Sequence, residues 1–158
     1  MNSQELMHEY LNGVAALRQA TDGMTADQSR ARPVPGKWST LEVVCHLADI
    51  DALDAERMKR VIAEDQPTLM DADETRYAVA LAYQERELSE EVALIESTRR
   101  QMTRILRTLP PSALSRGSVY RIGDKTENRT LEQLLNKAIR HFRHHIPFIL
   151  EKRKALGM

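Results

Sequence analysis

The chain has 158 residues, of which 42% are hydrophobic and 29% are charged, a mixture typical of one globular domain over residues 1–158 rather than of a disordered chain. Lysine plus arginine and aspartate plus glutamate both number 23, so the formal net charge is zero. Because nucleic-acid binding depends on an excess of basic charge, the composition argues against a nucleic-acid partner.

Apolar residues recur at helical spacing near the N-terminus. This stripe consists of Leu6, Tyr10, Val14 and Leu17. Their separations of four, four and three residues predict an amphipathic helix from about Ser3 to about Ala20. A turn-rich stretch follows, and its residues 30–38 cannot be helical because Pro33 and Pro35 lack amide donors.

The clearest helix start lies at Ser39, because Glu42 follows three residues later and the two can form a capping box. We expect this helix to reach about Glu64, before Pro67. Its buried face comprises Val43, His46, Leu47, Ile50 and Leu53. Residues 72–84 are predicted to form a shorter helix or an irregular connection.

Two further helices are predicted in the second half of the chain. One begins at about Ser89, has acidic residues in its first turn, and ends before Pro110. Residues 115–129 are interpreted as an ordered loop. Thr130 and Gln133 then form a second possible capping box, which opens the last helix. The buried face of that helix comprises Leu134, Ala138, His141, His145 and Ile149.

No alternation typical of a strand is sustained anywhere in the sequence. Four main amphipathic helices therefore predict an all-α protein, with a four-helix bundle as the simplest architecture. The two long connections, after the first and third helices, leave the order of the helices in the bundle open.

The last helix carries two histidines at a spacing that suits a metal ion. His141 and His145 are four residues apart, hence about 40° apart around the helix, and both lie on the apolar face. Two buried imidazoles repel each other if they are protonated, whereas a divalent ion can bind both in their neutral form. His144 is an alternative ligand in place of His145, since it is three residues from His141.

His46 occupies the same kind of inward position on the second helix. Three imidazoles with a fourth position open suit a catalytic site of the zinc type. Asp49 follows one turn later and is the candidate catalytic group, either orienting the His46 imidazole or reaching the metal. An ordinary solvated aspartate is the alternative interpretation of Asp49. Cys45 is interpreted as a small buried hydrophobe.

Two blocks of the sequence resemble a known family, the DinB/YfiT-like metalloenzymes. The first runs from Gly36-Lys37-Trp38-Ser39 through His46-Leu47-Ala48-Asp49, and the second contains Leu131, Leu134, Leu135 and His141-x-x-His144-His145. The resemblance implies a bundle in up-down-down-up order, a homodimer, and a zinc or nickel ion. The family's ligands fall on His46, His141 and His145. Ile146-Pro147-Phe148 stands where many members have arginine and glutamine, and Pro147 is expected to kink the helix.

The resemblance implies a metal-dependent enzyme acting on a small molecule, by thiol transfer with a low-molecular-weight thiol or by hydrolysis. The alternative is a non-catalytic metal- or small-ligand-binding protein of the stress response. A purely structural bundle is the third hypothesis. One cysteine, no signal-peptide pattern at the N-terminus, and no apolar run near the roughly 20 residues of a membrane span predict a cytoplasmic protein without a membrane partner.

Overall fold

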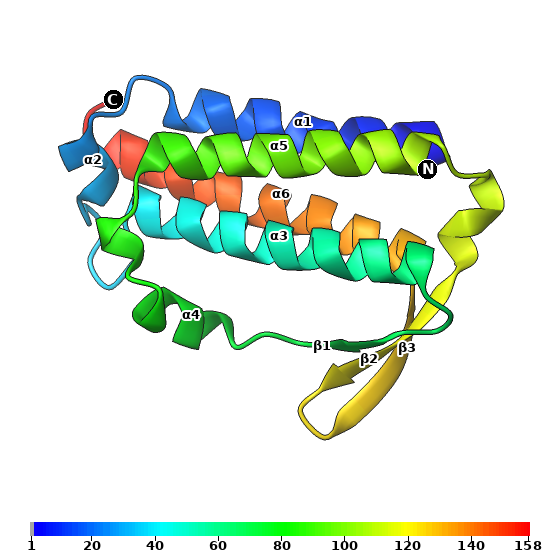
Figure 1. The fold of residues 1–158 in the computed structure, drawn as a ribbon. Helices are drawn as coiled ribbons and strands as arrows, with labels where there is room; N and C mark the ends of the chain where they lie inside the picture. The colour runs from blue at the N-terminus through cyan, green and yellow to red at the C-terminus, as the bar shows by residue number, and fades with distance from the viewer. Residues whose placement is uncertain (1) are drawn as a thin grey trace.

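The computed structural model describes residues 2–158, and four long helices dominate it (Figure 1). They are α1 (Ser3–Thr21), α3 (Thr40–Ala63), α5 (Leu88–Arg107) and α6 (Leu131–Ala155). Figure 1 shows α3 and α5 running in one direction while α1 and α6 run in the other. The predicted four-helix bundle is therefore confirmed, and its helices follow an up-down-down-up order.

The helix starts follow from local hydrogen bonds. At the start of α3, the Glu42 amide donates to Ser39 Oγ at 3.1 Å and the Ser39 amide donates to Glu42 Oε2 at 2.7 Å. Thr130 and Gln133 form the same reciprocal pair at the start of α6. Both predicted capping boxes are thus confirmed. Helix α6 continues through Pro147 to Ala155.

The parallel arrangement of α3 and α5 explains the long connection between them. Because α3 and α5 run in the same direction, residues 64–87 must return along the length of the bundle before α5 can begin. This return segment contains β1 (Thr68–Met70), α4 (Glu74–Ala80) and a 3₁₀ turn (Tyr83–Glu85), and Figure 1 shows it running along α3. The short helix α2 (Ala26–Arg30) follows α1 and precedes α3 in the chain.

The prediction of an all-α protein was wrong in one region. Residues expected to form a loop instead form β2 (Gly117–Ile122) and β3 (Lys125–Thr130), an antiparallel hairpin that β1 joins in parallel to give the order β1-β2-β3. A two-residue turn joins the hairpin strands, and its Gly123 has a φ of 57°, which glycine adopts without a Cβ penalty. A second 3₁₀ turn (Pro111–Ser115) links α5 to β2.

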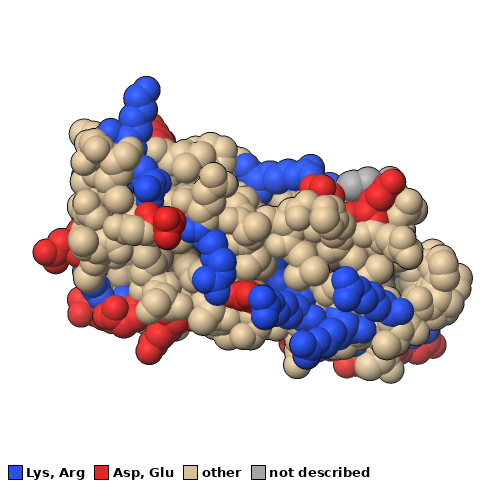
Figure 2. Space-filling model, turned by 90° about the horizontal axis from the view of Figure 1, so that it is seen from above, with Lys and Arg blue, Asp and Glu red and all other residues tan. Residues whose placement is uncertain are grey.

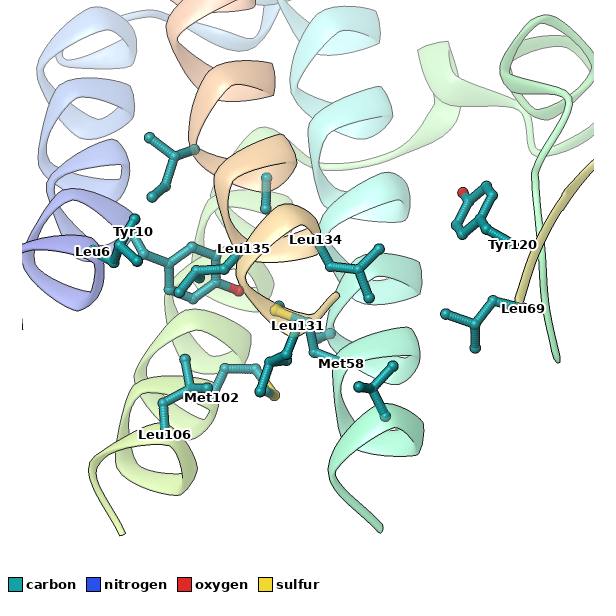
Figure 3. Packing of buried hydrophobic residues seen from close by; sticks show 14 residues of the cluster. Leu6, Tyr10, Met58, Leu69, Met102, Leu106, Tyr120, Leu131, Leu134 and Leu135 are labelled. Carbon is teal, nitrogen blue, oxygen red and sulfur yellow. The ribbon is translucent and has the colours of Figure 1, made fainter. Parts of the chain in front are cut away.

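The strands contribute to the core beside the helices. Leu69 of β1 and Tyr120 of β2 are fully buried, and Figure 3 shows them on the strand side of α3. Met58 of α3 belongs to the same core cluster. The other labelled core residues come from α1, α5 and α6 (Figure 3): Leu6, Tyr10, Met102, Leu106, Leu131, Leu134 and Leu135. The sheet is therefore part of the hydrophobic core rather than an external hairpin.

A buried ion pair crosses the centre of the bundle. Arg99 of α5 donates to both oxygens of Asp51 of α3, with the shortest contact at 2.7 Å, and also to the carbonyls of Tyr10 and Ala138. Both charged side chains are at most 1% exposed. A Cβ at Gly13 would lie 2.6 Å from Arg99 Nη1, so glycine there makes room for the guanidinium. One side chain thus contacts all of the long helices.

The outer surface mixes both signs of charge. On the face seen from above, Figure 2 shows acidic and basic side chains, some of them next to one another, and broad areas of other residues. Within residues 2–158, no helix is both long enough and apolar enough to cross a membrane.

Candidate metal centre

The three predicted histidines meet between α3 and α6. One ring nitrogen from each of His46, His141 and His145 can be chosen so that all three lie within 4.8 Å of one another. His46 Nε2 and His141 Nε2 are 2.9 Å apart. Packing of α3 against α6 therefore brings together residues that are 95 positions apart in the chain.

His144 lies outside this cluster. Its side chain is exposed, and its ring contacts His145 and Phe148 rather than His46. The His145 ring, in contrast, has its centroid 4.7 Å from both the His46 and the His141 rings. Of the two alternatives left open by the sequence, the structure places His145 in the cluster. His8 is exposed on α1.

Burial keeps the three imidazoles neutral. It lowers the pKa of His46 to about 4, and together with repulsion between the rings it lowers the pKa of His141 to about 2 and that of His145 to about 4. Neutral imidazole is the form that binds a metal ion. At neutral pH the cluster therefore presents three lone-pair donors rather than three cations.

These donors fit a divalent ion that favours nitrogen ligands. Two neutral imidazoles facing each other can share only one hydrogen bond, and the buried Nδ1 atoms of His46 and His145 have no hydrogen-bond partner within residues 2–158. An ion at the centre can accept a lone pair from each ring at once. Three imidazoles suit zinc and nickel without distinguishing between them.

Asp49 is near the cluster but is held by another residue. Its carboxylate accepts two hydrogen bonds from Arg86, each at 3.0 Å, and Arg86 also donates to Glu91 at the start of α5. No hydrogen bond joins Asp49 to His46 in the described chain. The expected orienting contact is therefore replaced by an ion-pair network that fixes the end of the return segment against α3.

A carboxylate that the sequence did not single out lies closer to the histidines. Glu74 Oε2, in the first turn of α4, is 3.7 Å from His46 Nε2, and its side chain is 46% exposed. Burial raises the pKa of Glu74 from its usual value. Glu74 is 28 residues from His46, and the sequence left open whether its segment is a helix or an irregular connection. No spacing rule could therefore have identified it.

Two other residues of the predicted block border the site. The Trp38 ring lies 5.4 Å from the His46 ring, centroid to centroid, and stands before the start of α3. Cys45 is fully buried and contacts the Tyr83 carbonyl, as expected for a small core residue. Burial raises the pKa of the Cys45 thiol to about 12, so this chain supplies no thiolate nucleophile at neutral pH.

The pKa values predict how metal-free protein responds to acid. A histidine has a pKa near 6.5 in the unfolded chain, so below that pH the unfolded state binds protons that the folded cluster does not. Stability is therefore full above about pH 7.5 and is lost as the pH falls toward 4. The expected slope is up to about 1.4 kcal/mol per pH unit for the buried His46 imidazole, and less for the partly exposed His141 and His145.

Urea unfolding of chelator-treated protein between pH 7.5 and pH 5 measures this slope. His46→Gln removes one of the contributing groups and is expected to flatten the dependence, whereas His144→Gln, at an exposed position, is expected to leave it unchanged. Equal slopes for wild type and His46→Gln would show that the cluster does not set the acid sensitivity.

Comparison with known proteins identifies the family of the chain. A profile of the DinB superfamily matches residues 11–149. A Bacillus subtilis protein named "Putative metal-dependent hydrolase YfiT" is 31% identical over 143 residues, covering 90% of this chain and 79% of the relative.

The solved structure of YfiT from Bacillus subtilis, described as an unusual four-helix bundle topology, superposes with a TM-score of 0.86 at 28% identity. The superposition covers 98% of this chain and 87% of that chain. The family resemblance expected from the two sequence blocks is thus confirmed by sequence and by fold. This chain belongs to the DinB superfamily.

Proposed function

We propose that the chain binds one divalent ion, zinc or nickel, through His46, His141 and His145 and hydrolyses a small molecule there. The observation that carries this proposal is the meeting of three neutral imidazoles, one buried and two half-buried, between α3 and α6. A divalent ion held by three imidazoles lowers the pKa of water toward neutrality and polarises a carbonyl group.

The chain's own residues supply the remaining functions. Glu74 is the proposed proton acceptor, because its carboxylate lies 3.7 Å from His46 Nε2 and is partly open to solvent. It would take the proton of the attacking water and pass it to the leaving group. Asp49 is proposed to act as a positioning residue, since its pair with Arg86 ties the return segment carrying Glu74 to α3.

The name of the Bacillus subtilis relative supports hydrolysis as the reaction class. Thiol transfer, the other reaction expected from the sequence, needs a low-molecular-weight thiol from outside the chain because Cys45 is buried and protonated. No contact at the site favours that thiol over water. Homodimerisation, a stress-response role and a cytoplasmic location stay predictions.

Ester hydrolysis by zinc- and nickel-loaded protein tests the proposal. With p-nitrophenyl acetate, the loaded protein is expected to exceed the chelated protein in rate. Glu74→Gln is expected to lower kcat by about 100-fold, the usual effect of losing a general base, while the ion content stays unchanged. Glu56→Gln, at an exposed position on α3, serves as the matched control.

Two outcomes would contradict parts of the proposal. A bound ion without turnover of esters or amides would favour the non-catalytic binding protein that the sequence left as the alternative. Full activity in Glu74→Gln would remove that carboxylate from the reaction while leaving the metal centre in place.

A further inference from the structure

A buried ammonium group without a carboxylate partner lies beside the histidine cluster. Lys152 of α6 is only 2% exposed. Its Nζ donates one hydrogen bond, to the Phe148 carbonyl at 3.0 Å, although an ammonium has three hydrogens to donate. No carboxylate of residues 2–158 lies within ion-pair distance of Lys152.

The neighbouring acids do not neutralise it. Glu42 is engaged by Arg32 and by the Ser39 amide at the start of α3, and Glu151 is exposed. Burial lowers the pKa of Lys152, as expected for a cation that lacks a partner. Buried charges in proteins are normally paired, so an unpaired one beside a candidate active site is a feature that a bound anion would explain.

A hollow of about 260 Å³ contains this lysine. Lys152 and the exposed Lys37 give it two positive groups, and His145 connects it to the histidine cluster. Trp38 and Phe148 give it two aromatic surfaces. Gly36 and Val43 complete the lining. Two cations and two aromatic rings around one small space suit a flat apolar molecule that carries a negative charge.

We propose that this hollow binds the carboxylate of a small aromatic or other planar acid, with Lys152 and Lys37 contacting the carboxylate and Trp38 and Phe148 contacting the apolar body. The proposal deepens the hydrolytic function and rests on it for the reaction: it makes the substrate an anionic ester or amide whose scissile group extends toward His145. Binding of the acid itself does not require the metal.

Fluorescence of Trp38, the sole tryptophan, offers a direct measurement of this binding. Chelator-treated wild-type protein is titrated with benzoate and, separately, with uncharged benzyl alcohol. Benzoate is expected to change the emission with a saturable curve, and benzyl alcohol is expected to bind at least about tenfold more weakly, because it lacks the charge that pairs with the ammonium.

Lys152→Met keeps the length of the side chain and removes its charge. We expect it to weaken benzoate binding by about tenfold or more, while Lys154→Met, at an exposed position of the same helix, leaves binding unchanged. Lys37 is exposed, so Lys37→Met is expected to fold as wild type does and to weaken benzoate binding by a smaller factor than Lys152→Met. The proposal would be overturned if Lys152→Met and Lys37→Met both bound benzoate as tightly as wild type does. It would also be overturned if benzoate produced no saturable change in the Trp38 emission of wild type.

Zinc content separates this proposal from the proposed function. Lys152→Met is expected to bind zinc as wild type does, since it removes none of the three imidazoles. Loss of benzoate binding with intact zinc binding supports the anion site. Wild-type protein that binds benzoate but no zinc would refute the metal-dependent function and leave the anion site standing.

Discussion

The His46→Ala, His141→Ala double variant is expected to retain no divalent ion, whereas wild-type protein retains about one ion per chain. The double change removes the two rings whose Nε2 atoms are 2.9 Å apart and leaves His145 alone. A single imidazole cannot hold zinc or nickel against dilution. Elemental analysis after equilibration with the ion and desalting measures the difference.

Thermal melting supplies a second measurement of the same site. An ion at 100 times its dissociation constant stabilises the folded protein by about 2.7 kcal/mol, so wild type is expected to melt higher with zinc and the double variant is not. His144→Ala, at the exposed neighbouring histidine, is the matched control and is expected to behave as wild type. A wild-type chain with neither bound ion nor stabilisation would refute the metal centre.

Acid is expected to reduce this stabilisation, because protons compete with the ion for the imidazoles. Burial lowers the pKa of His46 and His145 to about 4 in the folded metal-free chain, so the increment produced by zinc should shrink as the pH falls from about 5 toward 4. An increment that stays constant over this range would indicate that ligands other than histidine hold the ion.

The parts of the fold that depend on local signals were predictable. The start of α3 depends on Ser39 and Glu42, which are three residues apart, and the buried faces depend on helical spacing. The same spacing placed His141 and His145 on the inward face of α6, and the structure brings both to His46. Apolar periodicity was therefore sufficient to find the histidine cluster.

The missed features depend on contacts between distant segments. The sheet requires Leu69 to lie beside Tyr120, 51 residues later in the chain, and most of β3 is exposed, so its sequence carries no alternation of apolar residues. Glu74 reaches His46 only because the return segment follows α3. Asp49 was expected to orient the His46 imidazole, but Arg86, 37 residues later in the chain, donates hydrogen bonds to its carboxylate.

The second large effect is expected at the buried ion pair. Arg99→Met should lower the free energy of unfolding by about 3–5 kcal/mol, because it leaves the Asp51 carboxylate buried without its partner. Burial already raises the pKa of Asp51 despite the adjacent guanidinium, which shows how strongly this position disfavours a free charge. Urea unfolding followed by circular dichroism measures the loss.

A double-mutant cycle separates the cost of the orphaned charge from the loss of the pair itself. Asp51→Ala in the Arg99→Met background removes the unpaired carboxylate, so we expect the double variant to regain a large part of the stability that the single variant loses. Arg100→Met is the matched control, because Arg100 is exposed and its ion pair with Glu96 lies at the surface, where such pairs contribute about 0–1 kcal/mol. A loss below about 1 kcal/mol in Arg99→Met, or a loss in the double variant equal to the sum of the Arg99→Met and Asp51→Ala losses, would show that the Arg99–Asp51 pair does not stabilise the packing of α5 against α3.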